Sequence, residues 1–359
     1  MNHVRSRPRL SNVASDFADF ARLICHGSSP LYERLVEGLV RDPPVLSLAA
    51  RCRRGQPPNL FFAAVHFLLL KGVRHELSTF YASITGAQRR RGNPYPYFRA
   101  FCLEHYEAVL RLISTRLVQT NEVARYACLV PAFALVAQRA QGRPLAMIEV
   151  GASAGLGLLW DSYSYDFGRG GRCGARRAAV QITCAVRGRY LPPLPINLPH
   201  VGARIGLDLN PIDVGDAEAT LWLQALVFPE HRERAERLRR ALQLARRKPP
   251  RVLAGNAADA LPTVLRDIPA DVPICVFHSF TLSQLPEAAR VRFTRTLARL
   301  AAERELYHVS LEWLTAAEQP LLELINYDGT ERAQTEVLAA CEPHGRWLMW
   351  QHRNGQRDS

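Results

Sequence analysis

The first 144 residues carry hydrophobic side chains three and four positions apart, the spacing with which an amphipathic helix buries one face. Such faces recur at 17–24, 31–40, 59–72, 97–115 and 122–138. None of these runs alternates with the period of two that a half-buried strand needs. The pattern predicts an all-α N-terminal region, residues 1–144, that ends at the polar connector Gln141-Gly-Arg-Pro144.

From Leu145 onward, short hydrophobic runs separated by helical stretches indicate a mostly parallel sheet. We expect strands at 146–150, 204–209, 251–254, 274–278 and 307–311, and helices at 155–163, 215–226, 230–247, 286–303 and 316–326. Segments 333–341 and 346–351 are expected to form a closing antiparallel hairpin. The segment at about 163–203, with its alternating run Ala179–Cys184, is interpreted as an inserted β-hairpin that could cap a ligand site. The sequence thus predicts an α/β protein whose residues 145–359 form a Rossmann-like domain.

A turn of small residues, Gly151-Ala152-Ser153-Ala-Gly155, directly follows the strand expected at 146–150. A turn that opens a helix offers backbone N–H groups to a ligand. Ser153 replaces the second glycine of the dinucleotide fingerprint, and Glu149 would repel a pyrophosphate. The pattern instead resembles the first motif of class I S-adenosylmethionine-dependent methyltransferases. That resemblance implies that Glu149 and the turn hold the amino-acid end of the cofactor; a turn whose glycines serve packing alone is the open alternative.

Three further polar residues lie at or just after the ends of expected strands. Asp208 ends the strand at 204–209 and could accept both ribose hydroxyls, although it lies much farther from the glycine turn than the usual 20 or so residues. Asn256 and Asp259 follow the strand at 251–254, where methyltransferases of this class bind adenine. The alternatives stay open: Asp208 or Asp213 could cap a turn, and Asp259 could cap a helix.

Three side chains near later strand ends are candidates for catalysis. His278 stands at a strand tip and could act as a general base, Ser279 could orient a substrate, and Glu312 adds a carboxylate near the same rim. A buried histidine with satisfied hydrogen bonds is the competing interpretation of His278. Another cluster of polar residues joins two hydrophobic helices and consists of Gln119, Thr120, Asn121 and Glu122. It could bind substrate or cap the second helix.

The chain has 359 residues, 48% hydrophobic and 22% charged, so it can bury a large core and is not disordered throughout. Its formal charge of +13 could suggest nucleic acid. Arginine supplies nearly all of that charge, and the densest run, 232–251, has acidic residues and leucines at helical spacing. We therefore interpret the run as a solvated helix face and do not expect a nucleic-acid partner, although charge alone does not exclude one.

Other features bound the setting of the protein. No hydrophobic run reaches the length of a membrane span, and residues 1–10 lack the hydrophobic core of a secretory signal, so we expect a cytoplasmic protein. The eight cysteines show no metal-binding spacing; we expect no metal site and reduced, buried thiols, with a Cys173–Cys184 disulfide as the weaker alternative. His66, inside a hydrophobic run, is expected to be a core histidine with a hydrogen-bond partner.

Four segments together resemble one uncharacterised bacterial family, domain of unknown function 2332: Gln119-Thr-Asn-Glu122, Glu149-Val-Gly-Ala-Ser-Ala-Gly-Leu156, Gly206-Leu-Asp-Leu-Asn-Pro211 and Pro343-His-Gly-Arg-Trp347. The resemblance spans nearly the whole chain. It implies a methyltransferase-like Rossmann domain behind a helical region and does not imply a substrate. The chain departs from the family pattern at Gly157, where asparagine is usual, and at Asn256, where aspartate is usual.

The leading hypothesis is an S-adenosylmethionine-dependent methyltransferase acting on a small molecule or another, unidentified acceptor. A non-catalytic cofactor-binding or protein-interaction module on the same fold is the alternative, favoured by Ser153, the long insertion and Asn256. A nicotinamide-dependent oxidoreductase is less favoured because of Glu149 and the missing glycine. The sequence does not indicate the oligomeric state.

Overall fold

A computed structural model describes the chain apart from residues 1–8, 53–55, 176, 315–316, 328–332 and 352–359. The chain divides into two compact units, one made of Met1–Thr120 with Asp216–Arg239 and the other of Asn121–Gly215 with Arg240–Ser359. This division by contacts groups residues 121–144 with the sheet. The predicted boundary at residue 144, as a boundary between separate domains, stays a prediction.

The described residues of the first unit are helical, as the hydrophobic spacing predicts. Two helix starts show why the chain turns where it does: Ser29 accepts a hydrogen bond from Tyr32 N, and Asp42 accepts one from Val45 N. Each cap is followed by a proline in the first helical position, which needs no N–H donor there. The helices are α1 (Leu10–Phe20), a π-helical turn (Ala21–Cys25), α2 (Pro30–Leu39), α3 (Pro43–Ala49), α4 (Pro57–Leu70), a 3-10 helix (Glu76–Phe80), α5 (Ala82–Thr85), α6 (Tyr95–Glu104), α7 (Tyr106–Thr115) and α9 (Ala217–Ala225).

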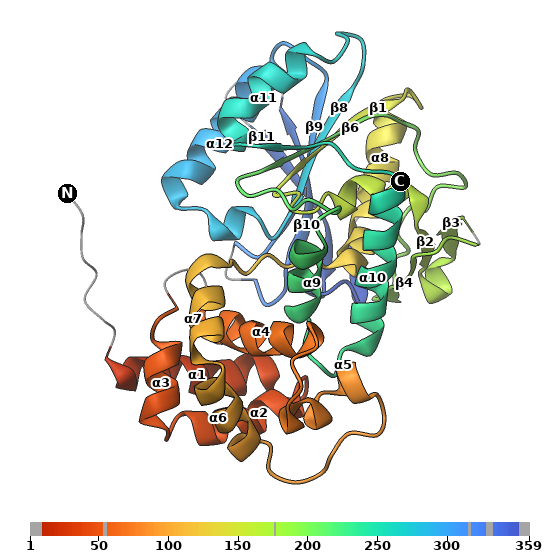
Figure 1. Cartoon of the computed structure of the whole chain (residues 1–359). Coiled ribbons are helices and arrows are strands. Elements are labelled where there is room, and N and C mark those ends of the chain that lie inside the picture. The colour runs from red at the N-terminus through yellow and green to blue at the C-terminus, as the bar shows by residue number, and fades with distance from the viewer. Residues whose placement is uncertain (1–8, 53–55, 176, 315–316, 328–332, 352–359) are drawn as a thin grey trace, which may run out of the picture. The chain divides into compact units, whose positions relative to one another are not determined.

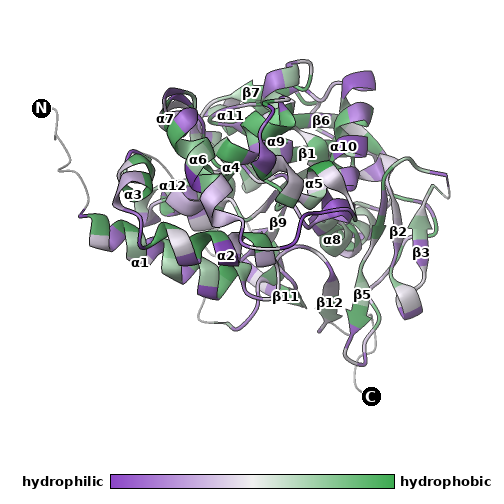
Figure 2. Cartoon of the chain, turned by 60° about the horizontal axis from the view of Figure 1, so that its bottom comes forward, coloured by the Kyte–Doolittle hydropathy of each residue, from purple (hydrophilic) through white to green (hydrophobic). Residues whose placement is uncertain are grey.

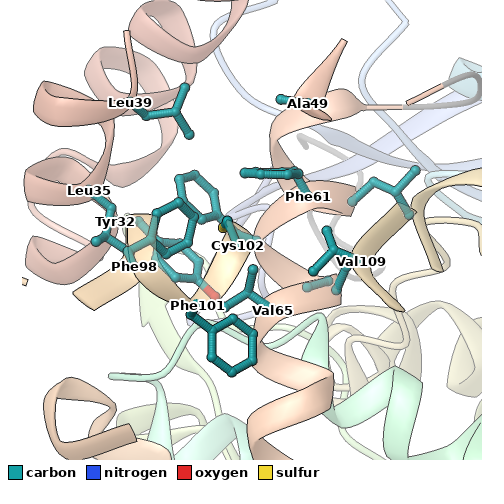
Figure 3. Close-up of a cluster of buried hydrophobic side chains, with 14 of the residues drawn as sticks. Tyr32, Leu35, Leu39, Ala49, Phe61, Val65, Phe98, Phe101, Cys102 and Val109 are labelled. Atoms are coloured by element: carbon teal, nitrogen blue, oxygen red, sulfur yellow. The ribbon is translucent and has the colours of Figure 1, made fainter. Parts of the chain in front are cut away.

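An aromatic core holds this unit together. Figure 3 shows Tyr32, Phe61 and Phe98 converging from α2, α4 and α6, and the rings of Phe61 and Phe98 meet edge to face at 6.0 Å between centroids. Helix α1 is amphipathic: Val13, Phe17 and Phe20 are buried, whereas polar residues between them are exposed, and Figure 2 shows the helix banded in green and purple. His66 is buried on α4 and hydrogen-bonds Ala225 O at 3.0 Å and Ser83 Oγ at 2.8 Å. The prediction of a satisfied core histidine is confirmed.

The second unit contains a nine-stranded sheet in the order β5-β12-β11-β10-β9-β8-β1-β6-β7, and a three-stranded sheet in the order β3-β2-β4. Strands β7, β6, β1, β8 and β9 are parallel, whereas β10, β11 and β12 continue the sheet in antiparallel fashion. The strands are β1 (Leu145–Val150), β2 (Ser164–Asp166), β3 (Arg172–Gly174), β4 (Gln181–Thr183), β5 (Ala185–Arg187), β6 (Val201–Asp208), β7 (Val252–Ala254), β8 (Ile274–Ser279), β9 (Leu306–Glu312), β10 (Leu321–Tyr327), β11 (Ala333–Cys341) and β12 (Trp347–Trp350).

Helices cover both faces of the parallel strands (Figure 1). Helices α11 (Ala257–Arg266) and α12 (Glu287–Ala301) pack together on one face, where Ile148 and Val276 alternate inward with their neighbours into a shared hydrophobic cluster. Helix α8 (Tyr126–Arg139) lies on the other face, where Phe133 meets Phe277 at 5.1 Å between ring centroids. Helix α10 (Arg232–Arg247) precedes β7. The mixed α/β class with a large, mostly parallel sheet is confirmed.

Two local predictions are corrected by the structure. Segment 316–326 does not form a helix: its described part runs into β10, where Leu322 and Leu324 are buried at the period of two and both neighbours, β9 and β11, supply hydrogen bonds. Segment 155–163 is helical, but as a 3-10 helix, Leu156–Ser162. The inserted segment forms β2–β5; β2 and β3 are antiparallel, and β5 joins the edge of the large sheet beside β12.

The remaining expectations about composition can also be compared with the structure. All eight cysteines are unpaired in the structure, and seven of them are buried, as expected; their reduced state stays a prediction. In the part of the chain that the structure describes, no helix combines the length and the apolar character that a membrane crossing requires. The same described residues contain no group of three or more histidine, cysteine or acidic side chains arranged to bind a metal.

Candidate functional site

The glycine turn lies at the carboxyl end of β1, where the strand order reverses: β6 and β7 lie on one side of β1, and β8 and β9 on the other. Ligands of open α/β sheets bind at such a reversal. Gly151, Ser153 and Gly155 all adopt positive φ angles, of 76°, 51° and 67°. A Cβ atom on Gly151 would lie 2.3 Å from Thr281 Oγ1, so the turn packs directly against the loop that follows β8. The positive φ angle and the packing together require glycine at position 151.

Glu149 is buried beside this turn, with only 4% of its surface exposed. Tyr126 O–H donates a hydrogen bond to Glu149 Oε1 at 2.9 Å, whereas Oε2 has no hydrogen-bond partner among the described residues. Burial raises the pKa of Glu149 to about 8; the hydrogen bond from Tyr126 opposes the shift, and the charge of Asp208 adds to it. Gly157 makes this pair possible, because a Cβ atom there would lie 2.2 Å from Oε1. The site therefore holds a carboxyl group with one oxygen that makes no hydrogen bond to the described residues.

Asp208, at the end of β6, reaches the turn. Its Oδ2 accepts a hydrogen bond from Ser153 N at 2.7 Å, and its Oδ1 accepts one from Asn210 N at 2.7 Å. The close approach of the two strand ends depends on Gly206, whose added Cβ atom would lie 2.7 Å from that of Ala152. Asp208 thus caps the turn, as the alternative interpretation holds, and its predicted contact with a ribose stays a prediction.

The predicted polar cluster at 119–122 is divided by the structure. Asn121 belongs to the sheet-containing unit and ties down the turn: its Nδ2 donates to Ser153 Oγ at 2.9 Å, and its Oδ1 accepts from Ala154 N at 3.5 Å. Glu122 is buried, and its Oε1 accepts from Ala124 N at 3.2 Å. Gln119 and Thr120 end the other unit, and their predicted role in substrate binding stays a prediction.

The side chains predicted to bind adenine lie at the start of α11. Asn256 is exposed and caps this helix, accepting a hydrogen bond from Ala258 N at 2.9 Å. Asp259 is exposed and forms an ion pair with Arg292 of α12. The helix cap proposed for Asp259 is therefore supplied by Asn256. Their contact with adenine stays a prediction.

His278 lies on the face of the sheet opposite Glu149. Phe277 pairs with Glu149 in the register of β8 and β1, so the two side chains lie on the same face. Successive residues of a strand point to opposite faces, and His278 therefore points to the α12 side, where it contacts the Phe293 ring. The histidine has no exposed surface. Its Nδ1 lies 2.8 Å from Glu312 Oε1, and its Nε2 lies 2.8 Å from His308 Nε2. The geometry thus gives His278 a buried, structural environment, and proton transfer to a ligand stays a prediction without support from it.

Glu312 acts as the anchor of the loop after β8. Its carboxylate accepts hydrogen bonds from Thr281 N at 2.7 Å, Leu282 N at 2.9 Å and Ser283 N at 3.2 Å, in addition to the contact with His278. Burial raises the pKa of Glu312, but the hydrogen bonds and the charge of His278 outweigh burial and hold it below its ordinary value. The same loop places Thr281 Oγ1 against Val150 O at 3.1 Å, so Glu312 supports the glycine turn indirectly.

Ser279 has a different position from His278. It lies two residues beyond Phe277 on the same strand, and therefore on the side of the sheet that carries Glu149. Its Oγ is buried and has no hydrogen-bond partner among the described residues. Its predicted role in orienting a substrate is compatible with this placement and stays a prediction.

Several residues at this edge were not singled out from the sequence. The turn after β11, residues 342–346, packs on the segment after Glu122: a Cβ atom on Gly345 would lie 2.4 Å from Ala124 O, and Arg125 Nε donates to Pro343 O at 2.7 Å. The Arg125 guanidinium lies 4.0 Å from the centroid of the Phe280 ring, and Phe280 has a strained φ of 53°. The resemblance included Pro343–Trp347 without a role; its contact partners depend on tertiary structure.

Comparison with known proteins identifies the family of the chain. A search of curated proteins gives no match. Residues 14–350 match a family described as an uncharacterized protein conserved in bacteria, domain of unknown function 2332. Because the match extends over well over half of the sequence, the chain belongs to this family.

Proposed function

We propose that the protein is an S-adenosylmethionine-dependent methyltransferase. The observation that carries the proposal is Glu149, a buried carboxyl group with an unused oxygen beside a glycine turn at the reversal of strand order. The order of the parallel strands along the sheet, β7-β6-β1-β8-β9, is third, second, first, fourth and fifth in the chain order of those five, the arrangement of doubly wound sheets.

The residues at the turn fit the chemical groups of this cofactor. Its amino-acid end carries an ammonium group, and Glu149 Oε2 is an acceptor that lacks a partner among the described residues. Each oxygen of Asp208 accepts one backbone N–H, and a carboxylate oxygen has a second lone pair with which to accept a ribose hydroxyl. Asn256 and Asp259 would lie toward adenine. When bound, the cofactor supplies a methyl group already activated on a sulfonium.

The protein's own side chains would orient these contacts. Tyr126 fixes the rotamer of Glu149, and Asn121 fixes Ser153, so the turn and its carboxyl group are arranged before a ligand arrives. Such pre-organisation lowers the entropic cost of binding. Catalysis of methyl transfer then rests mainly on proximity and exclusion of water.

The pKa of Glu149 adds a specific expectation. Because burial raises it to about 8, the carboxyl group is protonated in the ligand-free protein at neutral pH. An ammonium ligand favours the ionised form, so binding at pH 7 should release close to one proton. Titration calorimetry in two buffers of different ionisation enthalpy measures that release. Binding without proton release would contradict the contact between Glu149 and the ammonium group.

The first experiment is calorimetric titration with S-adenosylmethionine, S-adenosylhomocysteine and NAD. We expect binding of the first two and a loss of affinity of at least about tenfold in Glu149→Ala and Asp208→Ala, because each removes a charged partner. Asp213→Ala is the matched control, since Asp213 is exposed and caps only its own turn through Gly215 N. Failure of both adenosyl ligands to bind would overturn the proposal.

The alternative is a non-catalytic module on the same fold. The engagement of Asn256 in a helix cap and of Asp259 in an ion pair favours it, because these are the side chains expected at adenine. Tight binding of S-adenosylmethionine without release of S-adenosylhomocysteine, across hydroxyl, amine and thiol acceptors, would decide for the module. Binding of NAD would instead support the nicotinamide-dependent oxidoreductase.

A further inference from the structure

Glu122 and His344 come together at the carboxyl edge of the sheet from segments far apart in the chain. Glu122 Oε2 lies 3.5 Å from His344 Nδ1. The glutamate side chain is only 2% exposed, whereas 43% of the histidine side chain is exposed. The Nδ1 atom itself is buried. The imidazole therefore directs one nitrogen at a buried carboxylate and leaves its other side accessible.

This pair belongs to the same edge as the glycine turn. Glu122 directly follows Asn121, which hydrogen-bonds Ser153. The turn that carries His344 follows β11, whose Ala340 is level with Leu321 of β10 and, through it, with Glu312 at the carboxyl end of β9. The position of the turn that carries His344 thus follows from the register of the sheet and from the packing of Gly345 on Ala124.

Hydrogen bonds brace the backbone of the turn that carries His344. Glu342 is buried, and its Oε2 accepts hydrogen bonds from His344 N at 2.9 Å and Arg346 N at 3.0 Å. Although burial raises the pKa of Glu342, its hydrogen bonds with Arg346 and the nearby charges hold it below the ordinary value. Arg125 fixes the turn from the other side by donating to Pro343 O. These contacts fix the backbone that carries His344.

We infer that Glu122 and His344 form a proton-accepting dyad, in which Glu122 holds the neutral imidazole as its Nδ1–H tautomer and His344 Nε2 presents a lone pair to a substrate. A buried carboxylate that accepts from Nδ1–H fixes this tautomer in known hydrolytic triads. The 3.5 Å separation is long for a hydrogen bond, and such contacts often shorten only when substrate is bound.

The inference rests on the proposed function and adds a substrate class to it: an acceptor that bears an O–H or N–H group whose proton leaves during transfer. The proton passes to His344 Nε2, and the electron pair of the broken bond becomes available to attack the electrophilic methyl carbon. The pair of the carbon–sulfur bond goes to sulfur. Glu122 stabilises the imidazolium, which later returns its proton to water.

The first test uses the full-length protein, free of ligand, labelled with nitrogen-15 in histidine. Two-bond nitrogen–proton correlation spectra at about pH 8.5, where an ordinary imidazole is neutral, distinguish the two tautomers of the 11 histidines. His344→Gln identifies the signals of His344. We expect the Nδ1–H form in the wild type. The Nε2–H form in the wild type would overturn the inference.

Glu122→Gln tests the cause of the tautomer. The amide oxygen would replace Oε1 and keep the hydrogen bond from Ala124 N, so the NH2 group would face His344 Nδ1. A donor at that place requires an unprotonated Nδ1, and we expect the tautomer to change to Nε2–H. Glu342→Gln is the control for a lost charge in the same turn and should leave the tautomer unchanged. No change in Glu122→Gln would also overturn the inference.

A second measurement follows the reactivity of Nε2 towards diethyl pyrocarbonate, by mass spectrometry of the modified peptides. In Glu122→Gln the reactive lone pair would move to the buried Nδ1, and we expect modification of His344 to slow by about tenfold, the effect of inverting one hydrogen bond. His26, whose Nδ1 lies 3.0 Å from Glu33, is the internal control. Equal rates at His344 in both proteins would contradict the dyad.

These measurements separate the dyad from the proposed function. If S-adenosylmethionine binds and the tautomer test fails, methyl transfer stands and His344 is not its proton acceptor. If the tautomer and reactivity tests succeed and no adenosyl ligand binds, the dyad stands and serves a different reaction on a protic substrate.

Discussion

Replacement of Glu149 by glutamine should make the protein more stable, and the gain should grow with pH. Glutamine keeps the shape of the side chain and can still accept a hydrogen bond from Tyr126, but it cannot ionise. In the wild type, burial raises the pKa of Glu149 from 4.5 to about 8. The folded state therefore retains a proton that the unfolded chain loses above about pH 4.5, and the wild type loses stability as pH rises from there to about 8.

The size of the effect follows from the same shift. One pKa unit corresponds to about 1.4 kcal/mol. Relative to low pH, where Glu149 is protonated in both states, the free energy of unfolding of the wild type is therefore lower by about 3 kcal/mol at pH 7 and by at most about 5 kcal/mol above pH 8. The difference in unfolding free energy between Glu149→Gln and the wild type should be small near pH 4 and grow by this amount towards pH 9.

Urea unfolding of both proteins, followed by circular dichroism between pH 4 and pH 9, measures this difference. Tyr126→Phe serves as a second variant: loss of the hydrogen bond to the carboxylate should extend the decline of stability to higher pH, because that bond opposes the pKa shift. A stability difference between Glu149→Gln and the wild type that is constant with pH would refute the argument that Glu149 is buried and protonated.

Three further predictions concern other residues. Gly157→Ala should lower the free energy of unfolding in urea by about 1–3 kcal/mol, because its Cβ atom would lie 2.2 Å from Glu149 Oε1. Gly202→Ala is the control and should have a smaller effect, since its Cβ atom would lie 3.3 Å from the nearest atom. Equal effects of the two substitutions would contradict the predicted clash at Gly157. Glu312→Gln should lower the free energy of unfolding by about 2–4 kcal/mol, because the Glu312 carboxylate accepts three backbone N–H groups and contacts His278. Its control is Glu323→Gln, half-buried on the neighbouring strand, which should lower the free energy of unfolding by under about 1 kcal/mol. Burial lowers the pKa of His66 to about 4, so its contribution to stability is present above about pH 6.5 and lost as pH falls towards 4. Over that range the thermal midpoint of His66→Gln should fall less than that of the wild type. Parallel curves for the two proteins would contradict the lowered pKa of His66.

The sequence predicted the parts of the site that depend on local order. The hydrophobic run before Glu149 and the small residues after it specify a buried strand and a tight turn within a few positions, and β1 and the positive φ angles at Gly151 and Gly155 confirm them. Asp208 was placed at a strand end for the same reason, and β6 ends there. These features need no knowledge of distant residues.

Features that depend on which segments pack together were not predicted. The neighbours of His278, which are His308 and Glu312, both lie on β9. The register of β8 with β9, in which His308 pairs with Val276, brings them to His278. Nothing near His278 in sequence indicates those partners. The run Leu321-Leu-Glu-Leu-Ile325 fits both helical and strand periods, so the sequence alone does not distinguish a helix from a strand there. The pairing of β10 with β9 and β11 decides for the strand.

The pairing of β12 with β5 has a consequence for the order of folding during synthesis. Among the described strands β12 is made last, yet it lies between β11 and β5, and β5 belongs to an insertion completed far earlier in the chain. The ribosome releases the N-terminal parts first, so β5 must wait without its partner until Trp347–Trp350 emerges. A chain that terminates before Trp347 would leave the hydrogen-bonding edges of β11 and β5 open, and such edges promote aggregation.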